Sequence, residues 1–510
     1  MSANATLTNM SDQRPTPKDL EKGSIEHERH SPHEAGTPLI VHFESGDNLD
    51  PHQWPAWKRY GTVAFASWLN VLVCIGASGY STGSTEIAED FGVSDEIVTL
   101  GLSLYVLGFA FGPMLLAPFS EFYGRKPIYL VSWFIFTVFQ IPLAVAPNIA
   151  TVLVCRFIQG FMGSTPLANT GGVVHDIFRR DESGFATSIY ALSSTIGPPF
   201  GNGVTGYIAQ NLGWRWLFWF NLIIFGAHFL ILLVFFPETR DTIILMKKAR
   251  QVREKTGNDD YVAPHENDRK QPGRLWKVSL VRPFKFLFTE PITIFSALYN
   301  GFLFGLIFLF NESFPLMFGT GNGGHGWTHS GTVNLTFLSL VVGSVLAWLF
   351  STPFQERFYQ AALTRNGGKS VPEARVACAL IGTFLLPIGL FIAAWTSYQD
   401  ITFIAPLIGA AVFGFGFYQV LYSILNYVVD GYGHYSASAL AGVVLVRNLF
   451  GAGFPLFARQ MYVNLGNQWA TCLLAFLSIL LIPIPFYLFY YGRTVRYASP
   501  YCREHFDEED

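Results

Sequence analysis

Twelve stretches of about 20 mostly apolar residues run along the chain and are separated by polar segments. Because a helix needs about 20 apolar residues to cross the hydrocarbon core of a bilayer, each stretch predicts one transmembrane helix. The predicted spans are 60–82, 97–119, 127–147, 149–172, 184–208, 214–236, 291–318, 331–353, 376–396, 401–427, 437–459 and 469–491. The pattern therefore predicts an all-α integral membrane protein.

A long polar segment divides the spans into two groups of six. A short echo supports two related halves, because Pro-Phe-Ser-Glu (118–121) follows the second span and Pro-Phe-Gln-Glu (353–356) follows the eighth. Two parallel halves around a central site are a common plan of membrane transporters. The expected organisation is a disordered tail, a six-helix half, a linker, a pseudo-symmetric six-helix half and a second tail, at 1–55, 56–236, 237–288, 289–492 and 493–510.

Composition and charge support this architecture and orient it. Only 14% of the 510 residues are charged and 50% are hydrophobic, whereas soluble chains carry about 25% charged residues. Lys and Arg are concentrated in the loops after the second, fourth, sixth and eighth spans, so the positive-inside rule places these loops and both termini in the cytoplasm. The net charge of −3 favours no nucleic-acid partner, and the five cysteines have neither metal-ligand nor disulfide spacing.

Three charged side chains lie within predicted spans: Arg156 in the fourth, Glu312 in the seventh and Arg447 in the eleventh. Charge at membrane depth is costly, so such residues indicate function by default. We expect them to handle charge or couple transport to protons. The alternatives are a structural charge for each arginine and an interfacial position for Glu312, near the outer end of its span. Asp430, at the cytoplasmic end of the tenth span, is expected to be solvated.

The loop after the second span predicts a conformational latch. Gly124 permits a tight turn, while Glu121, Arg125 and Lys126 could contact helix ends of the other half and hold the cytoplasmic side closed. A simple positive-inside anchor is the alternative reading of these residues.

The fifth span contains Gly197, Pro198 and Gly201 within a Gly-Pro-Pro-Phe-Gly motif. Proline removes a backbone donor and kinks a helix, and glycine lets helices approach closely. The motif predicts a hinge or a tight helix crossing, with a static kink as the alternative. Gly160 and Gly163 in the fourth span also predict close helix packing.

Aromatic rings beside polar groups could form an adaptable substrate cavity, although packing or lipid contact is the default role of any one of them. The candidate cavity residues are Gln159, Phe218, Tyr299, Asn300, Phe302, Asn311, Tyr418 and Tyr422.

Seven motifs in order along residues 50–497 carry a family resemblance. They lie at 118–127, 156–164, 197–201, 213–219, 237–240, 430–439 and 447–458. As a set they resemble the fungal drug:proton antiporter family of twelve spans, within the major facilitator superfamily. The resemblance implies the major facilitator fold, a latch at Glu121, Gly124, Arg125 and Lys126, and proton coupling by the motif from Arg156 to Gly163. The motif at Gly197 marks antiporters, and so implies export.

The resemblance also implies the partners and the location. It implies a small organic substrate (a drug, toxin, secondary metabolite, organic acid or polyamine), protons and lipid as partners, no cofactor, a monomer, and the proton gradient as the energy source. The plasma membrane is expected, with the vacuolar membrane as the alternative. Two residues depart from the family's latch motif: Ala117 stands where Gly is usual and Glu121 where Asp is usual. Glutamate keeps the charge, so altered latch geometry is expected.

Other classes of protein remain as alternatives. A proton symporter importing a nutrient is the nearest, and the motif at 197–201 argues against it. An ATP-driven pump is disfavoured, because Gly368-Lys369-Ser370 is preceded by Leu363 where a phosphate loop requires its first glycine. An enzyme would need clustered His, Asp or a nucleophile with a base at membrane depth, and the histidines are scattered. A receptor built on the same fold stays open.

Overall fold

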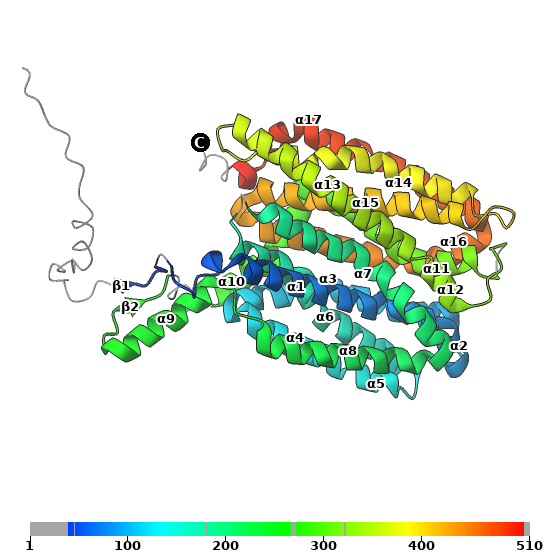
Figure 1. The fold of residues 1–510 in the computed structure, drawn as a ribbon, viewed down its shortest axis with the longest axis horizontal. Helices are drawn as coiled ribbons and strands as arrows, with labels where there is room; N and C mark the ends of the chain where they lie inside the picture. The colour runs from blue at the N-terminus through cyan, green and yellow to red at the C-terminus, as the bar shows by residue number, and fades with distance from the viewer. Residues whose placement is uncertain are drawn as a thin grey trace, which may run out of the picture.

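The computed structural model describes residues 39–503, apart from 45, 180–181, 265, 267–271 and 321–322. Long helices lie side by side and form one elongated bundle (Figure 1). Helices are expected at membrane depth because lipid offers no hydrogen-bond partner, so backbone groups must be satisfied within each segment. The helical membrane fold predicted from the hydrophobic pattern is confirmed.

The N-terminal half contains six passes within the described residues. Its helices are α1 (Ala56–Ser78), α2 (Ser84–Phe91), α3 (Asp95–Tyr123), α4 (Arg125–Val138), α5 (Gln140–Ala144), α6 (Ile149–Ile177), α7 (Ser183–Leu212) and α8 (Trp214–Phe235). A 3₁₀ turn at Gly79–Gly83 joins α1 to α2, and α4 leads directly into α5. The first pass therefore consists of α1 and α2, and the third of α4 and α5.

The C-terminal half repeats this plan. Its helices are α11 (Pro291–Phe318), α12 (Ser330–Leu335), α13 (Leu338–Arg365), α14 (Ala377–Trp395), α15 (Ile404–Tyr432), α16 (Ser436–Leu481) and α17 (Pro483–Ala498). Gly466 breaks α16, with a φ of 77° that other residues rarely adopt. The eleventh pass ends there, and the twelfth continues through the rest of α16 into α17.

Nine helical stretches of the described chain are long and apolar enough to cross a membrane. One of them, Ser436–Ala498, contains 63 residues and makes two passes because of its break at Gly466. α6 and α7 are not among the nine because Gly, Ser and Thr dilute their apolar residues, yet their 29 and 30 residues exceed the length of about 20 that a span needs. The described helices are therefore consistent with twelve spans.

The same pair of passes crosses most closely in each half. In the N-terminal half, a Cβ on Gly160 of α6 would lie 1.9 Å from the carbonyl oxygen of Tyr105 on α3. In the C-terminal half, a Cβ on Gly343 of α13 would lie 1.9 Å from the carbonyl oxygen of Ala411 on α15. The close packing predicted at Gly160 is confirmed, and the second and fourth passes of each half meet backbone to backbone.

The two halves meet through a few helices. α3 packs against α16, and α7 packs against α12, α13 and α15. These helices also run side by side in the bundle (Figure 1). The contact between the halves is therefore formed mainly by α3 and α7 on one side and by α12, α13, α15 and α16 on the other.

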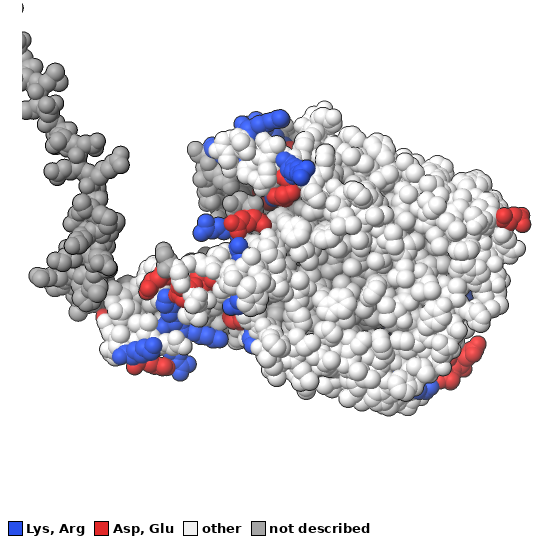
Figure 2. Space-filling view, in the orientation of Figure 1, with Lys and Arg blue, Asp and Glu red and all other residues white. Residues whose placement is uncertain are grey.

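A small unit outside the bundle joins the N-terminal segment to the linker. Strand β1 (Leu39–Ile40) pairs in parallel with β2 (Tyr261–Val262), beside α9 (Asp241–Thr256), and α10 (Pro272–Thr289) leads into the second half. The unit lies beyond the end of the bundle where charged side chains gather, while the middle of the visible face is white (Figures 1 and 2). Within the tail expected to be disordered, residues 39–44 and 46–55 are described and β1 pairs with the linker, whereas 1–38 lie outside the described residues.

Candidate functional site

Arg156 ties together three passes of the N-terminal half. The side chain is 1% exposed, and its guanidinium lies 4.5 Å and 4.2 Å from the rings of Tyr80 and Tyr105. It donates to three backbone carbonyls, of Gly76 (2.5 Å), Ala77 (2.8 Å) and Gly101 (3.1 Å). These bonds offset the cost of burying the charge. They give Arg156 a structural role, whatever part it has in coupling.

Glu312 lies at the contact between the halves, near the outer ends of the helices. It projects from α11, and Thr99 of α3 donates a hydrogen bond to its carboxylate at 3.2 Å. Close by, Arg459 of α16 forms a 2.9 Å ion pair with Asp95 at the start of α3. The hydrogen bond to Glu312 and the ion pair between Arg459 and Asp95 therefore join the halves at this end.

Arg156 and Glu312 do not contact each other in the described structure. The ring of Tyr80 packs against the Arg156 guanidinium. The Tyr80 hydroxyl donates to the carbonyl of Val98, and the next residue, Thr99, donates to Glu312. The two predicted charge-handling residues are thus not paired with each other.

Arg447 is the third predicted charge at membrane depth. It projects from α16, is 1% exposed, and lies 4.1 Å from the ring of Phe304 on α11. The next residue, Asn448, donates to the carbonyl of Phe109 on α3 at 2.8 Å. Arg447 therefore lies directly beside a hydrogen bond between the halves.

The Gly-Pro motif of α7 makes a tight crossing with α1. A Cβ on Gly197 would lie 2.6 Å from the Cβ of Cys74, and one on Gly201 would lie 2.8 Å from the Cα of Ile75. The helix continues through Pro198 from Ser183 to Leu212. Of the two structures that the motif predicts, the tight crossing is observed.

Three of the candidate cavity residues reach the other half. Asn311 accepts a 2.7 Å hydrogen bond from Asn202 of α7. Tyr418 and Tyr422 stack on each other with ring centroids 5.7 Å apart, and the Tyr422 hydroxyl donates to the carbonyl of Gly184 at the start of α7. These three residues therefore lie where the two halves meet.

Four other candidate residues make a hydrogen bond or ring contact within their own half. Gln159 donates to the carbonyl of Phe136, the ring of Phe218 faces Tyr80, the Tyr299 hydroxyl bonds to that of Thr383, and the ring of Phe302 meets Phe454. Asn300 donates to its own helix and leaves its side-chain oxygen without a partner. Helical periodicity in the sequence does not tell whether a side chain packs within its own half or faces the other half.

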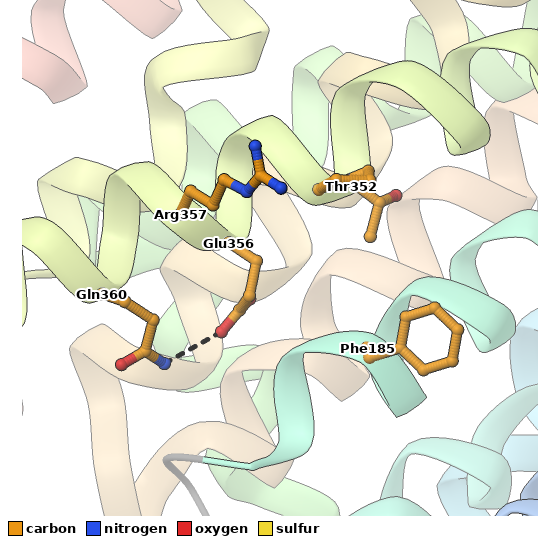
Figure 3. Close-up of a pocket in the computed structure, with 6 residues that line it drawn as sticks. Phe185, Thr352, Glu356, Arg357 and Gln360 are labelled. Carbon is orange, nitrogen blue, oxygen red and sulfur yellow. Dashed lines mark hydrogen bonds between the residues drawn. The ribbon is translucent and has the colours of Figure 1, made fainter.

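A pocket of about 470 Å³ opens between α7 and α13 at the cytoplasmic end. In Figure 3, Phe185 of α7 faces Thr352 and Glu356 of α13, and Gln360 donates to Glu356 at 3.1 Å. Trp348, one turn away from Thr352 on α13, donates to the Ser188 hydroxyl of α7 at 3.0 Å. The halves are therefore in contact at this end as well as at the outer end.

The predicted latch residue Arg125 is buried within its own half. Its guanidinium donates to Asp176 of α6 at 2.9 Å and to the Ser120 hydroxyl at 2.7 Å. Arg240, after α8, bonds to the other oxygen of Asp176 at 3.2 Å. The expectation that this basic residue contacts the other half is not met, because Asp176 satisfies it locally.

Gly124 allows a carboxylate to cap α4. Its φ of 105° favours glycine, and a Cβ there would lie 2.5 Å from the Glu238 carboxylate. Glu238 accepts from the backbone N–H groups of Arg125 at 2.8 Å and Lys126 at 3.2 Å, where the helix dipole favours an anion. Glu121 is exposed. The loop is therefore a rigid joint between the second, third and sixth passes.

A matching charge cluster lies in the C-terminal half. Arg375, 1% exposed, donates to Asp430 at 2.8 Å and to Glu356 at 3.1 Å, and its guanidinium lies 3.4 Å from the ring of Tyr359. The prediction of a solvated Asp430 is wrong, because this carboxylate is the counter-ion of a buried arginine. A Cβ on Gly184 would overlap Glu356, so this carboxylate also approaches the first turn of α7 in the other half.

Sequence reasoning missed Asp176, Arg375 and Asp430 as partners in these clusters. The echo of 118–121 at 353–356 does place Glu121 and Glu356 at equivalent points. However, the loop that follows is longer in the second half, so Arg375 does not stand at the spacing of Arg125. Only the fold brings the partners together.

Two related six-helix halves that meet through buried polar contacts are the architecture of membrane transporters that carry their substrate between the halves. The comparisons agree with this class. The model of the Major Facilitator Superfamily matches residues 66–455, and the chain belongs to this family.

Three relatives show how close the resemblance is. The efflux pump FUBT of Fusarium oxysporum is 36% identical over 92% of this chain and 78% of its own length. The multidrug transporter FLU1 of Candida albicans is 35% identical over 91% and 76%. The ascochitine biosynthesis cluster transporter of Didymella fabae is 37% identical over 89% and 87%. The human organic anion transporter MFSD10 has the same fold, with a TM-score of 0.53 at 17% identity, over 85% of this chain and 100% of its own.

Proposed function

We propose that this protein exports a small organic compound from the cytosol by alternating access, driven by inward proton flow. The observation that carries the proposal is the interface between the halves. Polar contacts join the halves at the outer end and at the cytoplasmic end, and the buried residues Arg447 and Asn448 lie at the same interface. The names of the relatives, which are efflux pumps and multidrug transporters, support the direction of transport. The compound is a drug, toxin, secondary metabolite, organic acid or polyamine.

Glu312 is the proposed proton carrier. Its carboxylate sits between α11 and Thr99 of α3, so a change in its charge acts directly on the contact between the halves. The charged groups that act on it are Arg459, Asp95 and Glu96, and Tyr80 is the ionisable group on the side of Arg156. Protonation from outside would weaken the charge-assisted bond from Thr99 and favour separation of the outer ends.

The remaining features follow from the family and from the distribution of charge. We propose a monomer in the plasma membrane, or else in the vacuolar membrane, with both termini in the cytoplasm and the proton gradient in place of a cofactor. The basic loops at the end that carries α9 support this orientation.

The test is intracellular accumulation of organic acids, polyamines, azoles and aromatic metabolites in yeast that lacks its own pumps. Expression of the chain should lower the accumulation of at least one compound, and a protonophore should abolish the effect. Accumulation that rises instead would indicate import and contradict the proposed direction.

Glu312→Gln tests the proton step. The amide keeps an oxygen that can accept from Thr99 but cannot exchange a proton, so export should lose its dependence on the proton gradient at unchanged surface expression. Glu290→Gln is the matched control, since Glu290 is a carboxylate that also accepts from hydroxyls, but at the cytoplasmic start of α11. Proton-dependent export by Glu312→Gln would remove Glu312 from the mechanism.

A further inference from the structure

Arg447 differs from every other buried arginine of the described residues. Its Nε and Nη2 have no hydrogen-bond partner, and its guanidinium lies against the face of Phe304. The other buried arginines are each bonded to carboxylates or carbonyls; they are Arg125, Arg156, Arg375 and Arg496. Arg447 is thus a buried cation that the described protein leaves without a counter-ion.

Such a charge is unfavourable unless something else compensates it. The free energy needed to transfer a guanidinium out of water is far larger than the free energy gained from contact with one aromatic ring. Leucine or methionine would fill the same volume without this cost. An anion that occupies the site during the transport cycle would compensate the charge and would explain an arginine at this position.

The surroundings place this cation between the halves. Arg447 itself belongs to α16, and Phe304 belongs to α11. The next residue, Asn448, donates to the carbonyl of Phe109 on α3 in the N-terminal half. The guanidinium therefore lies close to the place where α11 and α16 meet α3.

The positions of the two unbonded nitrogens also indicate which anionic group would fit. Nε and Nη2 form one edge of the planar guanidinium, and this edge matches the two oxygens of a carboxylate. Two uncharged amides lie close by: Asn300 is one helical turn before Phe304, and Asn448 directly follows Arg447. Both have a side-chain oxygen without a partner, so they can accept from hydroxyl or amine groups of the same ligand.

We propose that Arg447 binds the anionic group of the transported compound, so that the substrates are organic anions with a carboxylate or a similar planar group. The proposal rests on the proposed function for the fact of transport, and adds the class of compound. It makes organic acids the substrates and azoles and polyamines poor ones.

The test is thermal unfolding of the purified full chain in detergent with three probes that share one ring: benzoate, benzamide and benzylamine. Sodium chloride keeps the ionic strength constant. Benzoate should raise the melting temperature of the wild type, whereas benzamide and benzylamine should not. In Arg447→Gln the benzoate concentration for half-maximal stabilisation should rise by at least about tenfold, since hydrogen bonds to a charged group are lost. Arg447→Lys should retain part of the effect.

A second readout separates a binding role from a structural one. Without ligand, Arg447→Gln should melt at the same temperature as the wild type or higher, because it removes an uncompensated charge. Arg156→Gln should melt lower, because it leaves three carbonyls without their donor.

Three results would overturn the proposal: equal stabilisation by benzoate and benzamide, stabilisation by benzoate that survives Arg447→Gln, or an effect of chloride alone that is as large as that of benzoate. None of these depends on export. Failure here and failure of the proposed transport direction are therefore distinguishable.

Discussion

Individual buried charges in this protein are compensated in different ways, and the difference predicts what each contributes to stability. Arg125 and Asp176 are 4% and 6% exposed and also bond to Ser120 and Arg240. Arg125→Ala would leave the Asp176 carboxylate with a single arginine in a poorly solvated site. We expect a loss of about 3 kcal/mol, at the low end for a broken buried pair.

Thermal unfolding of the purified protein in detergent measures this loss. The control is Arg59→Ala, which removes an ion pair with Glu182 of similar length, 2.9 Å, at the surface. That variant should lose less than about 1 kcal/mol, because solvent screens exposed pairs. Equal losses in the two variants would mean that the Arg125 cluster is not held by its charges.

At the scale of elements, the backbone contact between α3 and α6 should tolerate no side chain at position 160. Gly160→Ala would place a methyl group 1.9 Å from the carbonyl oxygen of Tyr105, so the two helices would have to separate. We expect a loss of about 1–3 kcal/mol, typical of overpacking.

Gly226→Ala is the matched control for Gly160→Ala, because Gly226 is also helical and a Cβ there meets nothing within 4 Å. The fraction of monodisperse protein after heating, read by size-exclusion chromatography, compares the two variants. A Gly160→Ala protein as stable as Gly226→Ala would show that the α3–α6 crossing can widen freely.

The unit formed by β1, β2 and α9 should depend on the ion pair between Lys248 and Asp47, 2.7 Å long. The Lys248 ammonium donates to Asp47 and lowers the pKa of that carboxyl below its ordinary value. Because the folded pKa is lowered, the stabilisation is complete at neutral pH and is lost only as the pH falls through the lowered value. Protection of the unit should therefore be the same at pH 7 and at about pH 5.

Lys248→Met should speed cleavage by chymotrypsin at Phe43, which packs against α9 beside this pair. Lys247→Met is the control, because Lys247 is the exposed neighbour on the same helix. Similar cleavage of both variants would mean that the apolar contacts alone hold the segment.

At the scale of the whole molecule, contact between the halves at both ends predicts that locking either end stops transport. Ser188 and Trp348 meet at the cytoplasmic end, while the hydroxyls of Tyr207 and Thr332 lie 3.4 Å apart at the outer end. Cysteines at either pair, in a chain without its native cysteines, can be joined by a short bis-methanethiosulfonate, which forms a reducible disulfide with each cysteine and releases sulfinate. We expect each cross-link to abolish export and reduction to restore it.

Single-cysteine variants treated with the same reagent are the controls for modification alone. They should keep their export activity. Export that continues with a complete cross-link at either end would contradict alternating access by separation of the halves.

The helical membrane fold and the family were accessible from the sequence, because burial in lipid imposes about 20 apolar residues per pass and places basic residues in alternate loops. The cost of charge in lipid also identified Arg156, Glu312 and Arg447 without any structure. These properties depend on local composition, which the chain carries residue by residue.

Only the tertiary structure decided the partners of these residues. Arg125 and Asp176 are 51 residues apart in the chain, and Thr99 and Glu312 are 213 apart, so no local pattern relates them. Whether a buried side chain such as Tyr299 faces its own half or, like Tyr422, the other depends on how the passes are rotated and packed. The free guanidinium edge of Arg447 is visible for the same reason: a missing partner can be recognised only once all neighbouring helices are in place.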